Sequence, residues 1–177
     1  QDLSFRAKFR SVISPYPKEY IKKIRLKNGK EAVLRPTKPE DEPLEAEMFK
    51  TFSEQTQRFR FSTIIKNVTH EFLVRFTNID YDREMAIIAE ISENGKKKMA
   101  GVVMIAADPY NEAAEYSIVV GDPWHHQGLG SILTDYIIKI AKGMGIKKIH
   151  ATFLKDNYIM LHMFKKRGFA ITEKEGL

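Results

Sequence analysis

The sequence contains no cysteine. This absence excludes disulfide scaffolds, thiolate nucleophiles and zinc sites with cysteine ligands. Long hydrophobic runs are also absent: the longest, Ala100–Ala107, falls far below the roughly 20 residues that a membrane helix needs. The first residues, Gln1-Asp2-Leu3, do not resemble a signal peptide. From its 177 residues we expect one globular, cytoplasmic domain without a membrane partner.

Positive charge is unevenly distributed along the chain. The formal net charge is +6, which by itself suggests a nucleic-acid partner. Residues 1–36, however, hold ten Lys/Arg and three Asp/Glu, whereas residues 37–177 hold nineteen and twenty. The body of the chain is therefore close to neutral, and we expect no nucleic-acid partner.

The N-terminal part of the chain contains a boundary and a turn. Residues 1–19 include Pro15 and Pro17 and show no hydrophobic period, which indicates a leader or an inter-domain linker before a single domain at 20–177. Asn28-Gly29 lies between apolar runs at 21–26 and 32–35. This pair predicts a β-hairpin, because both residues tolerate positive φ.

The rest of the chain predicts an α/β fold. Helices at 53–61 and 69–76 are expected to precede three apolar segments that form a β-meander. The meander strands are 84–91, 99–107 and 114–120, followed by a helix at 128–142, a strand at 148–154, a helix at 156–166 and a strand at 169–172. Antiparallel strands followed by alternating units imply a mixed sheet with helices on its faces.

The most informative segment lies where the third meander strand ends. A loop follows it, and Gly128-Leu129-Gly130 opens an amphipathic helix. The first turn of a helix has free backbone N–H groups and the positive end of the macrodipole. Glycine lets a phosphate approach that backbone closely. The pattern predicts a diphosphate site, although it is neither a P-loop nor the usual dinucleotide fingerprint.

This segment resembles the acyl-CoA motif of the GNAT superfamily of N-acyltransferases, Gln/Arg-x-x-Gly-x-Gly/Ala. The matching residues are His125-His126-Gln127-Gly128-Leu129-Gly130, with histidine in the first place. A later family pattern is matched by Asn157, Phe164 and Gly168-Phe169. The resemblance implies the GNAT fold, a mostly antiparallel twisted sheet flanked by helices and splayed between strands 114–120 and 148–154.

A narrower resemblance is to the acetyltransferase domain of bacterial protein lysine acetyltransferases. Residues 34–43, Arg58-Phe59-Arg60-Phe61 and residues 80–86 carry it. In many of those proteins the domain is fused behind an acyl-CoA synthetase-like region, so the resemblance implies a domain of a longer protein. It also implies acetyl transfer to protein lysines, with acyl-CoA synthetases as targets.

The resemblance assigns the cofactor-binding residues. Acetyl-CoA is the implied co-substrate, and no metal is implied. Backbone groups of Ile118, Val119 and Val120 should pair with the pantetheine arm, and amides of His125 through Ser131 should hold the diphosphate. Asn157 should contact the pantetheine or its thiol end. Phe164 stands where many family members have a tyrosine that protonates the leaving thiolate, so the proton donor is left unassigned.

The general base is implied in the same way. A lysine amine is about 0.04% neutral at pH 7, so supplying the nucleophile costs roughly 4.6 kcal/mol without help. Glu115 occupies the position of the family's base, provided that Glu115, Ser117 and Val119 face the cleft. Glu112 is its rival and is expected in the preceding turn. Arg58 and Arg60 either reach the CoA phosphates or brace the sheet.

Three functions remain open at this point. Direct transfer to a protein lysine in a ternary complex is favoured, since no cysteine can carry a covalent acyl group. Transfer to a small amine or a protein N-terminus is the alternative. A non-catalytic acyl-CoA-binding regulatory module would bind acetyl-CoA without releasing the thiol to any acceptor.

Overall fold

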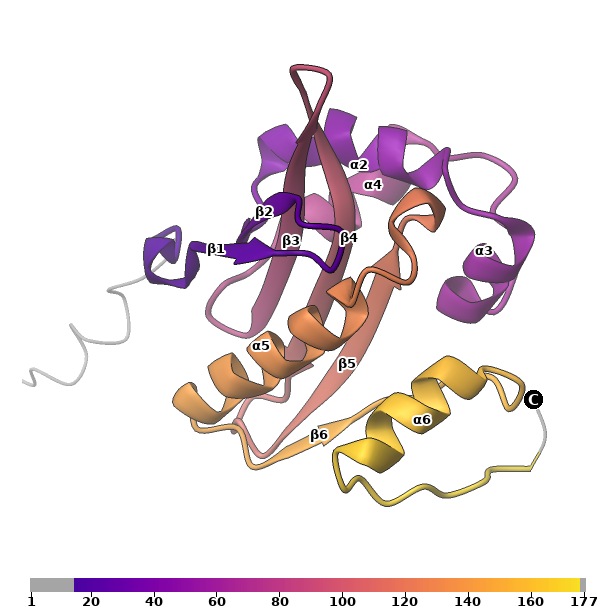
Figure 1. Ribbon diagram of the computed structural model, residues 1–177. Helices are drawn as coiled ribbons and strands as arrows, with labels where there is room; N and C mark the ends of the chain where they lie inside the picture. The colour runs from indigo at the N-terminus through magenta and orange to yellow at the C-terminus, as the bar shows by residue number, and fades with distance from the viewer. Residues whose placement is uncertain (1–14, 176–177) are drawn as a thin grey trace, which may run out of the picture.

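The computed structural model describes residues 15–175 and contains a six-stranded sheet in the order β1-β2-β3-β4-β5-β6 (Figure 1). The strands are β1 (Lys22–Arg25), β2 (Glu31–Pro36), β3 (Glu84–Glu93), β4 (Lys96–Ala107), β5 (Ala113–Val120) and β6 (Lys148–His150). All neighbours are antiparallel except β5 and β6, which are parallel. The expected α/β fold is confirmed.

The predicted hairpin and meander both form. Gly29 has a φ of 83° in the turn between β1 and β2, which explains why glycine suits this position. In the meander, β3 pairs with β4 and β4 with β5. The β3–β4 ladder has one register shift, between Ala89 and Glu90. The long apolar segments of β3, β4 and β5 supply the buried residues of this part of the sheet.

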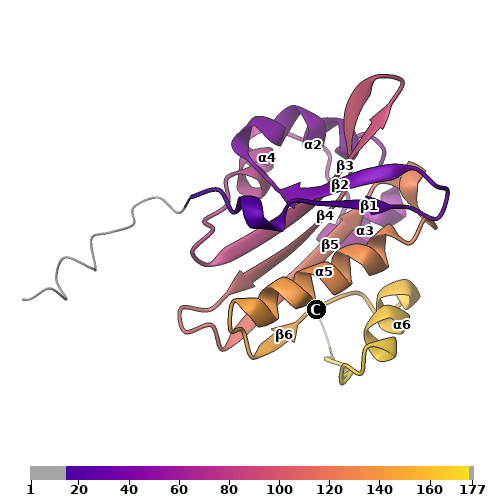
Figure 2. The ribbon, with the colours of Figure 1, turned by 60° about the vertical axis from the view of Figure 1, so that its left-hand side comes forward.

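Helices cover both faces of the sheet. They are α2 (Glu42–Phe49), α3 (Glu54–Phe61), α4 (His70–Thr77), α5 (Leu129–Gly143) and α6 (Tyr158–Lys166), with short 3₁₀ turns η1 (Lys18–Tyr20), η2 (Pro39–Asp41) and η3 (Asp122–Trp124). Figure 2 shows α2 and α4 above the sheet and α5 below it. Leu133 and Ile137 of α5 are fully buried in one core, and Met48 and Phe49 of α2 belong to the other. Ser53 and Thr69 begin α3 and α4 as N-caps, each accepting a backbone N–H.

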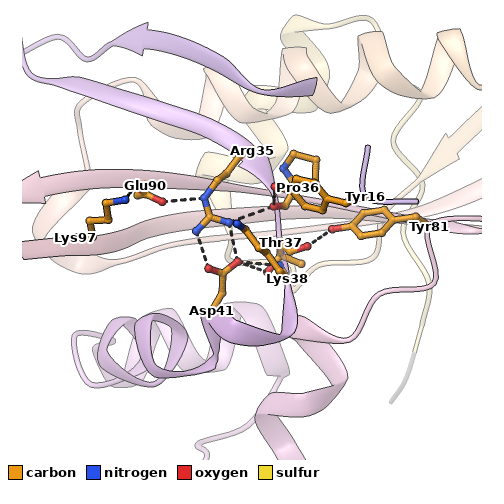
Figure 3. A network of polar contacts seen from close by, with 9 residues as sticks. All are labelled: Tyr16, Arg35, Pro36, Thr37, Lys38, Asp41, Tyr81, Glu90 and Lys97. Atoms are coloured by element: carbon orange, nitrogen blue, oxygen red, sulfur yellow. Dashed lines mark hydrogen bonds and ion pairs between the residues drawn. The ribbon is translucent and has the colours of Figure 1, made fainter. Parts of the chain in front are cut away.

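A buried ion network joins β2 to the start of α2 (Figure 3). Arg35 donates to both carboxylate oxygens of Asp41, at 2.8 and 2.6 Å, and its Nε donates to Glu90 at 2.8 Å. Asp41 also accepts the backbone N–H of Lys38 at 2.8 Å. Burial opposes ionisation of Asp41, but the Arg35 and Lys38 hydrogen bonds outweigh it and lower the pKa of that carboxyl. The network therefore fixes the start of α2 against β2 and β3.

Two predicted strands differ in the structure. The strand expected at 148–154 ends at His150, because β5 and β6 pair only through Ala113, Ala114 and Glu115. Residues 169–172 form no strand. A strand needs a neighbouring strand to pair its backbone N–H and C=O groups. The pairing of β5 with β6 ends at His150, so residues 151–154 have no such neighbour. Residues 1–14 of the expected linker lie outside the described residues.

Within residues 15–175, no helix combines the length and the apolar character that crossing a bilayer requires.

Candidate active site

The candidate site is a gap between β5 and β6. With β4, β5 pairs from Ala114 to Val120. Against β6 it pairs only as far as Glu115. The remainder of β5 has one edge without a strand partner in the described part of the chain. The predicted splay is therefore present, with β6 shorter than expected.

Strand alternation determines which peptide groups face the gap. The N–H of Gly121 donates to Ala100 on β4, so Val119, two residues earlier, also directs its peptide groups to β4. Ile118 and Val120 direct theirs to the open edge, where the carbonyl of Val120 lies 2.8 Å from Nε2 of His125. This geometry favours Ile118 and Val120 over Val119 for pairing with an extended ligand arm.

An amide cradle lies at the end of this edge. Gly128, the N-cap of α5, has a φ of 80°, and His126 has a φ of 64°. Within residues 15–175 the first-turn amides of Leu129, Gly130 and Ser131 donate to no protein acceptor. A methyl group built on Gly130 would meet no heavy atom within 4 Å. The cradle thus leaves open space beside free N–H groups, which fits a diphosphate.

Remote segments hold the loop that precedes α5. The indole N–H of Trp124 donates to Glu93 at 2.9 Å. Asp122 accepts from the hydroxyl of Thr56 at 2.8 Å and from the N–H of Ser53 at 3.1 Å. The loop is therefore attached to the tip of the β3–β4 hairpin and to the start of α3.

Lys27 is a residue of this site that sequence reasoning missed. Its N–H donates to the carbonyl of Gln127 at 3.2 Å. Its side chain runs over Gly128, and a methyl group built there would lie 3.3 Å from Cε of Lys27. The ammonium group is thus carried beside the N-terminus of α5. The only sequence signal was the excess of positive charge in residues 1–36.

Glu115 lies on the face of β5 that α3 approaches. The next residue on that face, Ser117, accepts a hydrogen bond from Nη2 of Arg60 at 3.3 Å. Val119 continues the same face and packs with α2. The opposite face carries Tyr116, which packs in the core under α5. Glu115, Ser117 and Val119 therefore share the face of β5 that α2 and α3 cover.

The surroundings of Glu115 include a second residue that the sequence did not single out. Glu115 is exposed, and its register partners are Ala106 on β4 and His150 on β6. Parallel partners share a face, so both side chains stand on the same face of the sheet at the last pair of the β5–β6 ladder. The rival carboxylate, Glu112, forms an ion pair with Lys147 at 2.9 Å in the turn before β5.

The two arginines of α3 contact different parts of the chain around the gap. Arg58 forms an ion pair with Asp156 at 2.7 Å, which connects α3 to the loop before α6. Arg60 contacts β5 through Ser117. Of the two roles left open by the sequence, the contacts in the structure favour bracing over phosphate binding.

Asn157 and Phe164 lie at the start and near the end of α6, the helix that follows β6. Asn157 is buried and caps the helix, its Oδ1 accepting the N–H of Met160 at 3.3 Å. Phe164 is buried and stacks on Phe153. The ring of Tyr116 meets Phe164 edge-on, and burial raises the pKa of this phenol. Tyr116 is therefore a poor acid and does not replace the missing tyrosine hydroxyl.

Comparisons with known proteins agree with this arrangement. The model of the acetyltransferase (GNAT) family matches residues 46–169. Acetyltransferase PA5475 of Pseudomonas aeruginosa is 26% identical over 144 residues, which cover 81% of this chain and 77% of that protein. Acetyltransferase Pat of Mycolicibacterium smegmatis is 25% identical over 173 residues, which cover 97% of this chain and 49% of that protein. The chain thus spans about half the length of that relative.

A solved structure shows the same fold. The GNAT domain of S. lividans PAT superposes with a TM-score of 0.80 at 21% identity, covering 90% of this chain and 93% of that chain. The family resemblance carried by residues 125–130 and by Asn157, Phe164 and Gly168-Phe169 is confirmed.

Proposed function

The chain belongs to the GNAT family of acetyltransferases, and we propose that it transfers acetyl from acetyl-CoA directly to the side-chain amine of protein lysines. The observation that carries the proposal is the position of Glu115 beside the open edge of β5, on the face approached by α3. Similarity to the M. smegmatis Pat and to the PAT domain supports a protein acceptor. Acyl-CoA synthetases are the proposed targets.

The co-substrate fits the residues present. The amides of His126 to Ser131 at the start of α5 would hold the diphosphate, and the open space at Gly130 admits it. Peptide groups of Ile118 and Val120 would pair with the pantetheine arm. Asn157 and Phe164 would border its thiol end. The ring of His125 already contacts Val120, so His125 would contribute its backbone and brace the loop.

The reaction follows from these positions. Glu115 accepts a proton from the lysine ammonium, which supplies the neutral nucleophile at a cost of roughly 4.6 kcal/mol at pH 7 if unaided. The amine nitrogen forms a bond to the acetyl carbon, the carbon–sulfur bond breaks, and the electron pair leaves on the CoA sulfur. The nitrogen then loses its second proton, which ends on the CoA thiolate or in water. Direct transfer with both substrates bound is favoured over transfer through a thiol, because the chain has no cysteine to carry the acetyl group.

The decisive experiment uses the purified protein, labelled acetyl-CoA and a bacterial lysate, read by mass spectrometry of acetylated lysines. We expect labelled protein lysines, including those of a purified acyl-CoA synthetase added in a second arm. The matched control is Glu115→Gln, which should bind acetyl-CoA normally and label nothing above background. Labelling of small amines or protein N-termini alone would contradict the lysine proposal. Acetyl-CoA binding without CoA release to any acceptor would identify a non-catalytic module.

A further inference from the structure

One row of side chains crosses four strands of the sheet beyond the helices that cover its face. The strand register pairs Glu84 of β3 with Ala106 of β4, and Ala106 with Glu115 of β5. Glu115 in turn pairs with His150 of β6. Residues paired directly across neighbouring strands point to the same face. These four residues therefore form one continuous row, which we call the open row.

The cover of this face becomes thinner, row by row, toward the open row. On β5, Val119 is 7% exposed in the core with α2, Ser117 is half-buried and Glu115 is exposed. On β4, Met104 is half-buried and Ala106 is exposed. An exposed alanine in the middle of a row shows that no helix or loop between residues 15 and 175 lies over it. The open row is thus a floor that a partner can reach from solvent.

Both carboxylates of the open row lack a partner within the protein. Five glutamates lie on strands, and three of them form ion pairs with lysine or arginine: Glu31, Glu90 and Glu93. Within residues 15–175, the side chains of Glu84 and Glu115 form no hydrogen bond and no ion pair. The charges of the first three are satisfied inside the sheet, whereas those of Glu84 and Glu115 can pair with cations of a bound partner.

The spacing of the two carboxylates fits an extended chain. Directly paired Cα atoms are about 5 Å apart, so Glu84 and Glu115 stand about 10 Å apart with the small Ala106 between them. An extended segment advances about 3.3 Å per residue, and it covers this distance in about three residues. Arg60 lies one row away, where it donates to Ser117 at 3.3 Å, so α3 bounds the open row on that side.

We propose that the open row docks the lysine-bearing segment of the acceptor protein, and that Glu84 binds a second basic residue of that segment, about three positions from the target lysine. This inference rests on the proposed function, in which Glu115 accepts the proton of the target lysine. Glu84 selects the acceptor and takes no part in the proton transfer. A segment with a neutral residue at the second position loses an ion pair, and one with an acidic residue meets repulsion.

The experiment measures acetylation of synthetic peptides with blocked ends, a single lysine and an otherwise alanine-rich sequence. Each set carries arginine, alanine or glutamate at one position, two to four residues on either side of the lysine. The wild type should use the best arginine peptide with a kcat/KM about 2- to 5-fold above that of its alanine counterpart, mainly through KM, as expected for one exposed ion pair. This preference should shrink at high salt.

Variants at Glu84 show whether this residue causes the preference. Glu84→Gln should use the arginine and alanine peptides alike, while its affinity for acetyl-CoA stays within about twofold of the wild type. Glu84→Lys should prefer the glutamate peptide to the arginine peptide, and it serves as the second variant if the first does not fold. Glu71→Gln removes an exposed carboxylate of α4 and is the matched control, which should keep the arginine preference.

The outcomes separate this inference from the function on which it rests. Equal wild-type rates on the arginine and alanine peptides would overturn the role of Glu84 and leave the lysine acceptor intact. A folded Glu84 variant that keeps the arginine preference would do the same. Failure of the wild type to acetylate any lysine peptide would instead contradict the proposed function, and the docking proposal would fall with it.

Discussion

Glu115 and His150 are register partners across the parallel junction of the sheet, where β5 and β6 make their last pairing. Beyond this pair the two strands separate. A carboxylate-bearing and an imidazole-bearing residue thus occupy the last paired positions before the gap opens. Which of them is the base can be tested directly.

We expect Glu115→Gln to lower turnover by about 10²-fold or more, because general base catalysis typically contributes that much. His150→Gln should lower it by less than about fivefold, since the imidazole only neighbours the base. Steady-state rates of CoA thiol release, with acetyl-CoA affinity measured by calorimetry, check both. The reverse ranking of the two variants would make His150 the base.

Lys27→Met should weaken CoA binding by about 3- to 10-fold at low ionic strength, because it removes a cation beside the N-terminus of α5. The loss should shrink at high salt, which screens exposed charges. Lys23→Met changes the same charge on the same hairpin and should have no more than a twofold effect. Binding of CoA and dephospho-CoA by calorimetry is the measurement. A penalty seen only with CoA would assign Lys27 to the 3′-phosphate instead of the diphosphate.

Gly130→Ala should weaken acetyl-CoA binding by about 10-fold or more while leaving the melting temperature unchanged or slightly raised. The added methyl group meets no protein atom within 4 Å, and alanine favours a helix by roughly 0.5–1 kcal/mol over glycine. Gly143→Ala, at the other end of α5 and equally free of neighbours, should keep full affinity. Equal affinities in the two variants would show that no ligand approaches the backbone at Gly130.

Glu45 should make the folded protein less stable as the pH rises from about 5 to 8. Burial raises its pKa from about 4.5 to about 8 in the folded state, so the folded protein holds this proton more tightly than the unfolded chain does. The resulting stabilisation is present at low pH and is lost as the pH rises through about 8. The stability of Glu45→Gln should therefore increase relative to the wild type between about pH 5 and 8, by at most roughly 1.4 kcal/mol per pH unit. Urea unfolding at several pH values measures this difference. Glu47→Gln, an exposed change on the same helix, should show no such trend, and a constant difference for Glu45→Gln would contradict the raised pKa.

Local patterns in the sequence were sufficient for much of the fold. Asn28-Gly29 predicted the first hairpin, although of the two only Gly29 takes the positive φ that the turn requires. The apolar runs of β3, β4 and β5 predicted the meander. The length of β6 was not predictable, because residues 151–154 are as apolar as a strand. They form none only because β5 and β6 separate after His150 and leave them without a strand to pair with. The same limit applies to residues 169–172.

The candidate site was predictable where its residues are close in sequence. The loop from His125 to Ser131 and the strand with Glu115 came from one continuous segment. Lys27, Arg60 and His150 reach this segment from the first hairpin, from α3 and from β6, and no spacing in the sequence connects them to it. The charge excess near the N-terminus was a signal for Lys27, but only the structure shows that the β1–β2 turn lies over Gly128.

The attachments of the loop before α5 couple ligand binding to the entire domain. Trp124, Asp122 and Gln127 bond to the β3–β4 hairpin, to the start of α3 and to the β1–β2 turn. A chain in which any of these segments has unfolded loses the binding loop as well. With acetyl-CoA bound as proposed, saturation at 100 times its dissociation constant would add about 2.7 kcal/mol to the free energy of unfolding. That stabilisation would extend to the β3–β4 hairpin, the start of α3 and the β1–β2 turn, because the loop is bonded to all three.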